Sequence, residues 1–268
     1  MSERSDYPIG APCWVETFQP DPQAAAQFYG ELLGWRFDEP TPMPEGLGGQ
    51  HLTARIGSRR VAGIGQAQET TPTAIWLTSI SVDSVEDALA RVADGGGALL
   101  AGPLQAGTDG RVAVVTDPAG IGFGLWQPQQ RAGAELVNEP GTWAMSALHT
   151  PAPERAEAFY GALFGWQLEA LPDAPFALWR LPGYVGGEPD QPMPRDVVAV
   201  MAAIEERSEV PPHWAVNFRV DDVDSTAEHA IGLGGQVLLA PSDTPGFRNA
   251  VIADPQHGVI AISAPTGF

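Results

Sequence analysis

Hydrophobic residues recur at helical spacing between Asp21 and Trp35, and this period predicts an amphipathic helix. Asp21 can accept hydrogen bonds from the free N–H groups of the first turn, and Pro22 suits the first helical position. Gly34 can end the helix in a left-handed conformation. The apolar positions of the helix are Ala25, Phe28, Leu32 and Trp35.

The same pattern returns 131 residues later, between Ala152 and Trp166. A second set of motifs is also repeated. Val82-Asp83-Ser84-Val85 matches Val220-Asp221-Asp222-Val223, and Asp117-Pro118 matches Asp254-Pro255. The chain therefore consists of two similar halves, and duplication on this scale is informative about fold.

Around each repeated helix, alternating apolar and polar residues predict strands, and each half reads as two units of order β-α-β-β-β. We expect an α+β protein with four βαβββ modules forming two domains with curved mixed sheets. The predicted segments are a tail at 1–9, a first domain at 10–130 with modules 10–68 and 74–128, a linker at 131–141, and a second domain at 142–268 with modules 142–204 and 212–265. Whether the first module closes on the second or on the fourth stays open.

Composition narrows the class of protein. The formal net charge is -19, which disfavours nucleic acid as a partner because a polyanion would be repelled. No apolar run is long enough for a membrane span. Cys13 is the single cysteine, which fits a reducing compartment, so we expect a cytoplasmic protein, monomeric or homodimeric.

The motifs resemble those of the vicinal oxygen chelate superfamily, which includes glyoxalases, bleomycin resistance proteins and extradiol dioxygenases. The resemblance rests on the repeated helix with Phe28-Tyr29-Gly30 and Gly34-Trp35, on Gly234-Gly235, and on Asp117-Pro118-Ala119-Gly120. More narrowly, Pro12-Cys13-Trp14-Val15-Glu16 looks like a two-domain actinobacterial subgroup labelled "hydroxylase" or glyoxalase-like antigen. The resemblance implies two glyoxalase-like domains and a cup-shaped sheet in each. Fold alone does not give function.

Many members of the family hold a divalent metal in the cup as a Lewis acid, on His, Glu or Gln ligands from the first and last strands. Six positions of this chain correspond to those ligands: Trp14, Leu77, Gly124, Met145, Ala215 and Ala261. None supplies an oxygen or nitrogen ligand, and a thioether is too soft for the metals concerned. We therefore expect no metal and no other cofactor.

Other polar residues lie near these positions. Glu16 shares the face of Trp14 and is a candidate general base, although a carboxylate paired with an arginine or capped by the backbone would also explain it. His149 and His213 have the parity of the cup face and are candidate ligand-binding residues, as is Asn217. Structural roles remain open for all of them.

Tryptophans suggest a different use of the cups. Trp14 and Trp126 are expected to line the first cup and Trp143 the second, while Trp76 would join them only if the register were shifted by one residue. Flat side chains suit stacking on planar ligands, but they could instead fill the cups with packed core. Two further candidates, Arg111 and Arg248, could bind a ligand oxygen or form structural ion pairs.

We therefore expect metal-independent binding of a planar, aromatic or hydrophobic small molecule, with a role in natural-product resistance or biosynthesis implied by the resemblance. The alternative is a cofactor-free or metal-dependent enzyme (hydroxylase, isomerase, lyase or dioxygenase) that uses Glu16 with His149 or His213. A non-catalytic protein-interaction role also stays open.

Overall fold

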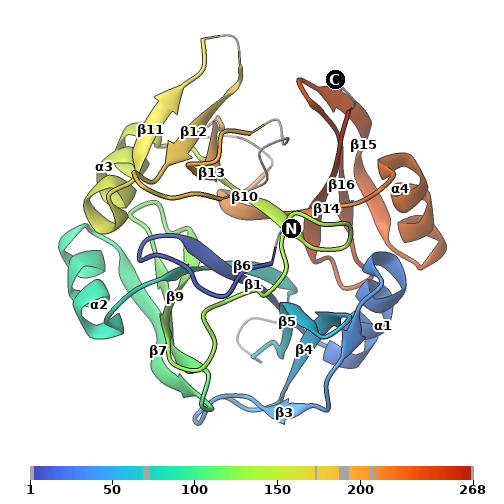
Figure 1. The fold of residues 1–268 in the computed structure, drawn as a ribbon, viewed down its shortest axis with the longest axis horizontal. Helices are drawn as coiled ribbons and strands as arrows, with labels where there is room; N and C mark the ends of the chain where they lie inside the picture. Colours follow the sequence, from blue (N-terminus) through green and yellow to red (C-terminus); the bar gives the residue numbers. More distant parts are fainter. Residues whose placement is uncertain are drawn as a thin grey trace.

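The computed structural model describes residues 3–68, 73–172, 174–186, 193–205, 208 and 210–266. The four predicted βαβββ units are present within these ranges and form two mixed sheets (Figure 1). The junctions at 68–74 and 204–212 between the predicted modules, and the module predicted at 142–204, lie partly outside the described residues. None of the described helices is long and apolar enough to cross a membrane.

The first sheet contains nine strands in the order β2-β4-β5-β1-β6-β9-β8-β7, with β3 added beside β4. Its elements are β1 (Pro12–Gln19), α1 (Pro22–Leu33), β2 (Arg36–Phe37), β3 (Thr41–Pro42), β4 (Gln50–Ile56), β5 (Arg59–Gln66), β6 (Ile75–Ser81), α2 (Val85–Asp94), β7 (Ala98–Ala106), β8 (Gly110–Thr116) and β9 (Gly122–Pro128).

The second sheet contains eight strands in the order β11-β12-β13-β10-β14-β17-β16-β15. Its elements are β10 (Trp143–Thr150), α3 (Pro153–Phe164), β11 (Gln167–Ala170), β12 (Phe176–Arg180), β13 (Val197–Ala203), β14 (His213–Arg219), α4 (Val223–Gly232), β15 (Gln236–Thr244), β16 (Phe247–Ala253) and β17 (Val259–Pro265).

The predicted helix signals are confirmed at α1. The Asp21 carboxylate accepts from the backbone N–H groups of Gln23 and Ala24, each at 3.0 Å. Gly34 follows the helix with φ of 74°, the left-handed conformation that only glycine adopts without strain. The equivalent α3 begins after Ala152, which has no side-chain cap, and it too ends at a left-handed glycine.

Hydrogen bonds and side-chain packing join the four units in two different ways. Within each sheet, consecutive units pair through their first strands, β1 with β6 and β10 with β14. The cores follow the other pairing. One apolar cluster combines the first unit with the fourth, and the other combines the second with the third. Figure 1 shows the result, with α1 beside α4 and α2 beside α3.

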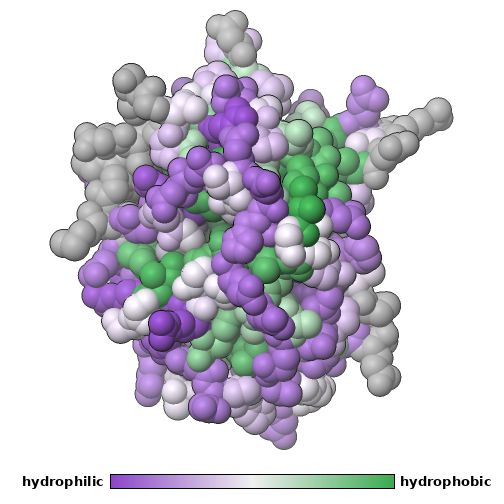
Figure 2. All heavy atoms as spheres, turned by 90° about the vertical axis from the view of Figure 1, so that its right-hand side faces the viewer, coloured by the Kyte–Doolittle hydropathy of each residue, from purple (hydrophilic) through white to green (hydrophobic). Residues whose placement is uncertain are grey.

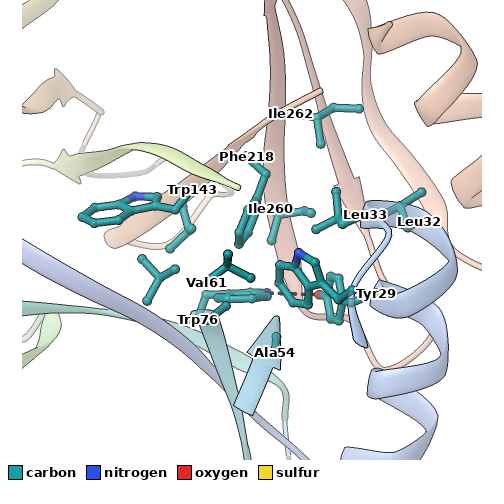
Figure 3. Close-up of a cluster of buried hydrophobic side chains, with 14 of the residues drawn as sticks. Tyr29, Leu32, Leu33, Ala54, Val61, Trp76, Trp143, Phe218, Ile260 and Ile262 are labelled. Atoms are coloured by element: carbon teal, nitrogen blue, oxygen red, sulfur yellow. Dashed lines mark hydrogen bonds between the residues drawn. The ribbon is translucent and has the colours of Figure 1, made fainter. Parts of the chain in front are cut away.

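Aromatic side chains meet at the boundary between the sheets. Trp76 of the first sheet lies 5.2 Å from Phe218 of the second, measured between ring centroids. Trp35 also contacts Phe218, at 5.4 Å. Figure 3 shows Phe218 and Ile260 facing Tyr29 and Val61 across this boundary. Hydrophobic residues on the face that carries α1 and α4 are visible as separate patches among polar ones (Figure 2).

A buried chain of hydrogen bonds crosses the boundary twice. The Trp76 indole donates to the Tyr29 hydroxyl at 3.1 Å, and that hydroxyl donates to Asp254 at 2.7 Å. In the other half Trp214 donates to Tyr160 at 3.0 Å, and Tyr160 donates to Asp117 at 3.3 Å. Each helix tyrosine therefore donates a hydrogen bond to an aspartate in a turn of the other domain.

The two aspartates also hold their own turns. Asp117 accepts from the N–H groups of Ala119 and Ile121 at 2.8 and 3.0 Å. Burial raises the pKa of Asp117, and these N–H groups and the Tyr160 hydroxyl act in the opposite direction. The Asp-Pro motifs recognised in the sequence are thus anchor points between the domains.

Replacing Tyr29 by Phe should lower the free energy of unfolding by about 1–3 kcal/mol, because the buried Trp76 indole would lose its acceptor and Asp254 a donor. Urea denaturation measures the change. Tyr184→Phe is the control, because the Tyr184 hydroxyl makes no hydrogen bond within the described residues, and it should change stability by less than about 0.5 kcal/mol. Equal stability of the two variants would contradict a structural role for the chain.

Two cups as candidate ligand sites

The concave side of the second sheet forms an apolar cup. Its cavity has a volume of about 250 Å³ and lies among strands β10, β12, β13, β14, β16 and β17. Apolar and aromatic side chains make up most of the wall. They include Trp143, Met145, Phe176, Val200 and Phe247.

A few polar groups converge on this cavity. Asn217 accepts at Oδ1 from the Ser263 hydroxyl at 2.8 Å, which leaves the amide nitrogen to face the cup. Arg219 donates from Nη1 to the carbonyl oxygen of Asn138 at 2.7 Å. Its Nε is buried and has no hydrogen-bond partner among the described residues. An apolar cavity with a small number of placed polar groups is the usual form of a small-molecule site.

The first cup has a different lining. An arginine occupies the space between the two tryptophans that the sequence places there. The Arg131 Cζ lies 4.1 Å from the centre of the Trp14 ring and 4.3 Å from that of Trp126. Cation–π contacts on both faces hold the guanidinium in place. Trp14 and Trp126 therefore stack on a side chain of the protein. The ring faces that contact Arg131 are not available for stacking on a ligand.

The predicted base Glu16 faces the first cup and meets a histidine there. The Glu16 carboxylate lies 3.4 Å from the Nε2 atom of His51, and both side chains line a cavity of about 580 Å³. Gly63 lies opposite Glu16 on β5, and a Cβ at this position would come within 2.8 Å of His51 Nε2. Glycine at this position leaves room for the pair, since a Cβ would displace the His51 ring from its present place.

The histidines expected to act with Glu16 are instead paired with each other. His149 and His213 stack on the second sheet, with ring centres 4.7 Å apart and planes 5° from parallel. His213 Nδ1 also hydrogen-bonds the carbonyl oxygen of Pro211 at 2.8 Å. Neither ring contacts Glu16 within the described residues.

Three other candidates lie away from the cups. Trp76 is part of the core between the domains. Arg111 forms an ion pair with Glu86 of α2, with 2.5 Å between nitrogen and oxygen. Arg248 pairs with Asp224 of α4 and with Asp243. Both arginines thus tie a sheet to its covering helix, the structural alternative considered from the sequence.

The strand register shows which residues share a row across each cup. In the first cup Trp14 is opposite Ser79, and Ser79 is opposite Gly124. In the second, Met145 is opposite Asn217, and Asn217 is opposite Ala261. Leu77 and Ala215 lie two residues before Ser79 and Asn217, in the neighbouring rows opposite Glu16 and Ala147.

These rows do not fit the divalent metal that the family resemblance implies. Each offers one hydroxyl or amide beside apolar side chains, whereas such metals prefer several carboxylate or imidazole ligands. Within the described ranges, no three His, Cys, Asp or Glu residues gather in a way that could hold a metal ion.

Sequence reasoning did not identify Arg131, His51 or Arg219 as site residues. Arg131 lies just after the last strand of the first domain, in a stretch interpreted as linker. His51 is far from Glu16 in sequence, and only the pairing of β4, β5 and β1 brings them together. The alternation of Asn217 and Arg219 on one strand was a usable signal for the third residue.

Comparison with known proteins assigns the class. Residues 14–125 match the model of the Glyoxalase/Bleomycin resistance protein/Dioxygenase superfamily, and residues 145–262 match that of a glyoxalase-like domain. The chain belongs to this superfamily, as the motifs indicated.

Two curated relatives align over nearly the whole chain. CFP32 of Mycobacterium tuberculosis, a glyoxylase by provisional assignment, is 37% identical over 273 residues, covering 99% of this chain and 98% of CFP32. The anthracycline biosynthesis protein DnrV of Streptomyces peucetius is 33% identical over 263 residues, covering 93% of this chain and 90% of DnrV.

Solved structures share the fold at low sequence identity. The Mn(II)-bound glyoxalase from Novosphingobium aromaticivorans has a TM-score of 0.63 at 16% identity, covering 96% of this chain and 82% of that one. The 2,3-dioxygenase LapB from Pseudomonas sp. KL28 has a TM-score of 0.64 at 13% identity, covering 97% and 94%.

The histidine stack should make stability depend on pH. Burial, and secondarily the neighbouring His213, lower the pKa of His149 from 6.5 to about 4. The unfolded chain therefore binds more protons than the folded one between these values, so stability falls as the pH drops from about 6.5 to about 4. We expect a loss of roughly 1–2 kcal/mol from this residue, allowing for its partial exposure.

Urea denaturation of the protein and of His149→Gln across this pH range tests the effect. The variant should show a shallower decline in the free energy of unfolding. Parallel pH profiles would show that His149 does not titrate in this way.

Proposed function

We propose that the protein binds a planar hydrophobic small molecule in the second cup, without a metal. The observation that carries this proposal is the apolar cavity among Trp143, Phe176 and Phe247, into which only a few polar groups project. Burial of an aromatic ring system against these side chains supplies most of the affinity. Asn217 and Arg219, which line the cavity, would fix its orientation through hydrogen bonds to a ligand oxygen.

The residues at the expected metal-ligand positions also support metal-independent binding. Met145, Asn217 and Ala261 lie where the family resemblance would require metal ligands. The similarity to DnrV, an anthracycline biosynthesis protein, supports a role in natural-product biosynthesis or resistance. Anthracyclines are planar polycyclic compounds, a shape that suits the wall of the second cup.

Acetonaphthone, a planar aromatic ketone, is a suitable probe of the second cup. Met145→Asp should weaken its binding at least tenfold, because the substitution adds a charge to the apolar wall. Met145→Leu keeps the volume and polarity and should change the affinity less than threefold. Isothermal titration measures both, with thermal unfolding as a check of folding. Equal affinities of the two variants would exclude this cavity as the binding site.

A second candidate function is proton transfer by Glu16 in the first cup. It is favoured by the contact between Glu16 and His51, since a carboxylate beside an imidazole can accept a proton and pass it on. Glu16 would remove a proton from the carbon next to a ligand carbonyl, and the electron pair would move to the carbonyl oxygen.

Deuterium exchange tests this candidate without knowledge of the natural substrate. In D₂O the protein should speed exchange of the acetyl methyl protons of acetonaphthone, followed by NMR, and Glu16→Gln should lower the rate at least tenfold. His229→Gln, on helix α4, is the control and should leave the rate unchanged. If the unaltered protein does not speed exchange beyond the rate in buffer alone, proton transfer by Glu16 is excluded.

A further inference from the structure

The first cup contains an arginine whose hydrogen-bonding capacity is not fully used. The Arg131 side chain is only 8% exposed, and its Nε donates to Asp109 at 2.9 Å. Its Nη1 is buried and has no hydrogen-bond partner among the described residues. A buried donor left unpaired costs about 1–3 kcal/mol. Arg131 lines the cavity, and within the described residues the one side-chain hydrogen bond that its guanidinium donates is to Asp109, so the group can still donate to an acceptor oxygen of a ligand.

Several contacts of its backbone and side chain hold this arginine in place. Its backbone N–H donates to the carbonyl oxygen of Asp109 at 3.2 Å, and its own carbonyl oxygen accepts from the Trp126 indole at 3.0 Å. The rings of Trp14 and Trp126 enclose the guanidinium. Gly110 leaves room for this arrangement, since a Cβ there would lie 2.7 Å from the Trp126 ring. A donor held this firmly loses little entropy when it binds.

The charges around the cavity limit what the ligand can be. Each arginine that lines it already has a carboxylate partner. These ion pairs are Arg131–Asp109, Arg60–Glu135 and Arg55–Asp38. Two further carboxylates, Glu16 and Glu45, line the cavity with no arginine partner among the described residues. The cup therefore carries excess negative charge, which repels an anionic ligand and favours one that donates a hydrogen bond to Glu16.

We propose that the first cup is a second ligand site, which takes a neutral planar compound with a carbonyl at one end and a hydroxyl at the other. The carbonyl oxygen accepts from the Arg131 guanidinium, and the hydroxyl donates to the Glu16 carboxylate. Arg131 stacks on Trp14, which lies two residues before Glu16 on the same face of β1. A substituted aromatic ring held between Arg131 and Glu16 would have Phe18 and Val112 as apolar walls.

Three matched compounds test the proposal. Para-hydroxyacetophenone has both groups, para-methoxyacetophenone lacks the donor, and para-ethylphenol lacks the carbonyl. Isothermal titration with the unaltered protein should show the first binding at least tenfold more tightly than either of the others. This comparison requires no variant, so it remains decisive if a substitution at Arg131 impairs folding. Equal affinity for the three compounds would overturn the proposal.

Variants in each cup then locate the site. Arg131→Met should weaken binding of para-hydroxyacetophenone at least tenfold, whereas Arg219→Met, the matched change in the second cup, should leave it unchanged. The proposal does not depend on the one for the second cup. Binding lost in Met145→Asp but kept in Arg131→Met would place the compound in the second cup and refute the first-cup site alone. Selective binding that survives Met145→Asp, with no binding of acetonaphthone, would refute the second-cup proposal alone.

Discussion

The buried Trp–Tyr–Asp hydrogen bonds hold the two domains in one arrangement, and both cups depend on them. Tyr29 and Tyr160 each reach from the helix of one domain to the turn aspartate of the other. The aspartates are 2% exposed, so in the joined domains the tyrosine hydroxyls supply hydrogen bonds that water does not. The same turns end the strands that precede β9 and β17, central strands of the two sheets. The contact between domains therefore also fixes the shape of each cup.

The same scaffold gives two cups of different chemistry through a small number of substitutions. Glu16 on β1 corresponds to Ala147 on β10, and Trp14 corresponds to Met145. The first cup is thereby supplied with a carboxylate and with a ring on which Arg131 stacks. The second retains an apolar wall and places its polar groups on β14.

The repeated motifs predicted the fold because they mark features that local chemistry determines. The left-handed glycine recurs at Gly34 and Gly165 and the Asp-Pro turn at Asp117 and Asp254, whereas the cap at Asp21 has no counterpart at Ala152. The candidate sites were only partly predictable. Strand parity placed Glu16 in the first cup and Trp143 in the second, but the partner of Glu16 came from a strand two removed in the sheet. The position of Arg131 between two tryptophans could not be predicted either, since it depends on how the chain turns back after β9.

The reciprocal bonds between the tyrosines and aspartates have the form of an isologous contact. In such a contact the tyrosine of each half binds the aspartate of the other half. Such a contact arises in a homodimer with a two-fold axis. The chain therefore has the internal symmetry of two half-length subunits joined end to end. A symmetric pair of subunits must carry identical cups, because every mutation appears in both. Fusion removes this restriction, and the divergence of one polar and one apolar cup within a single molecule is its consequence.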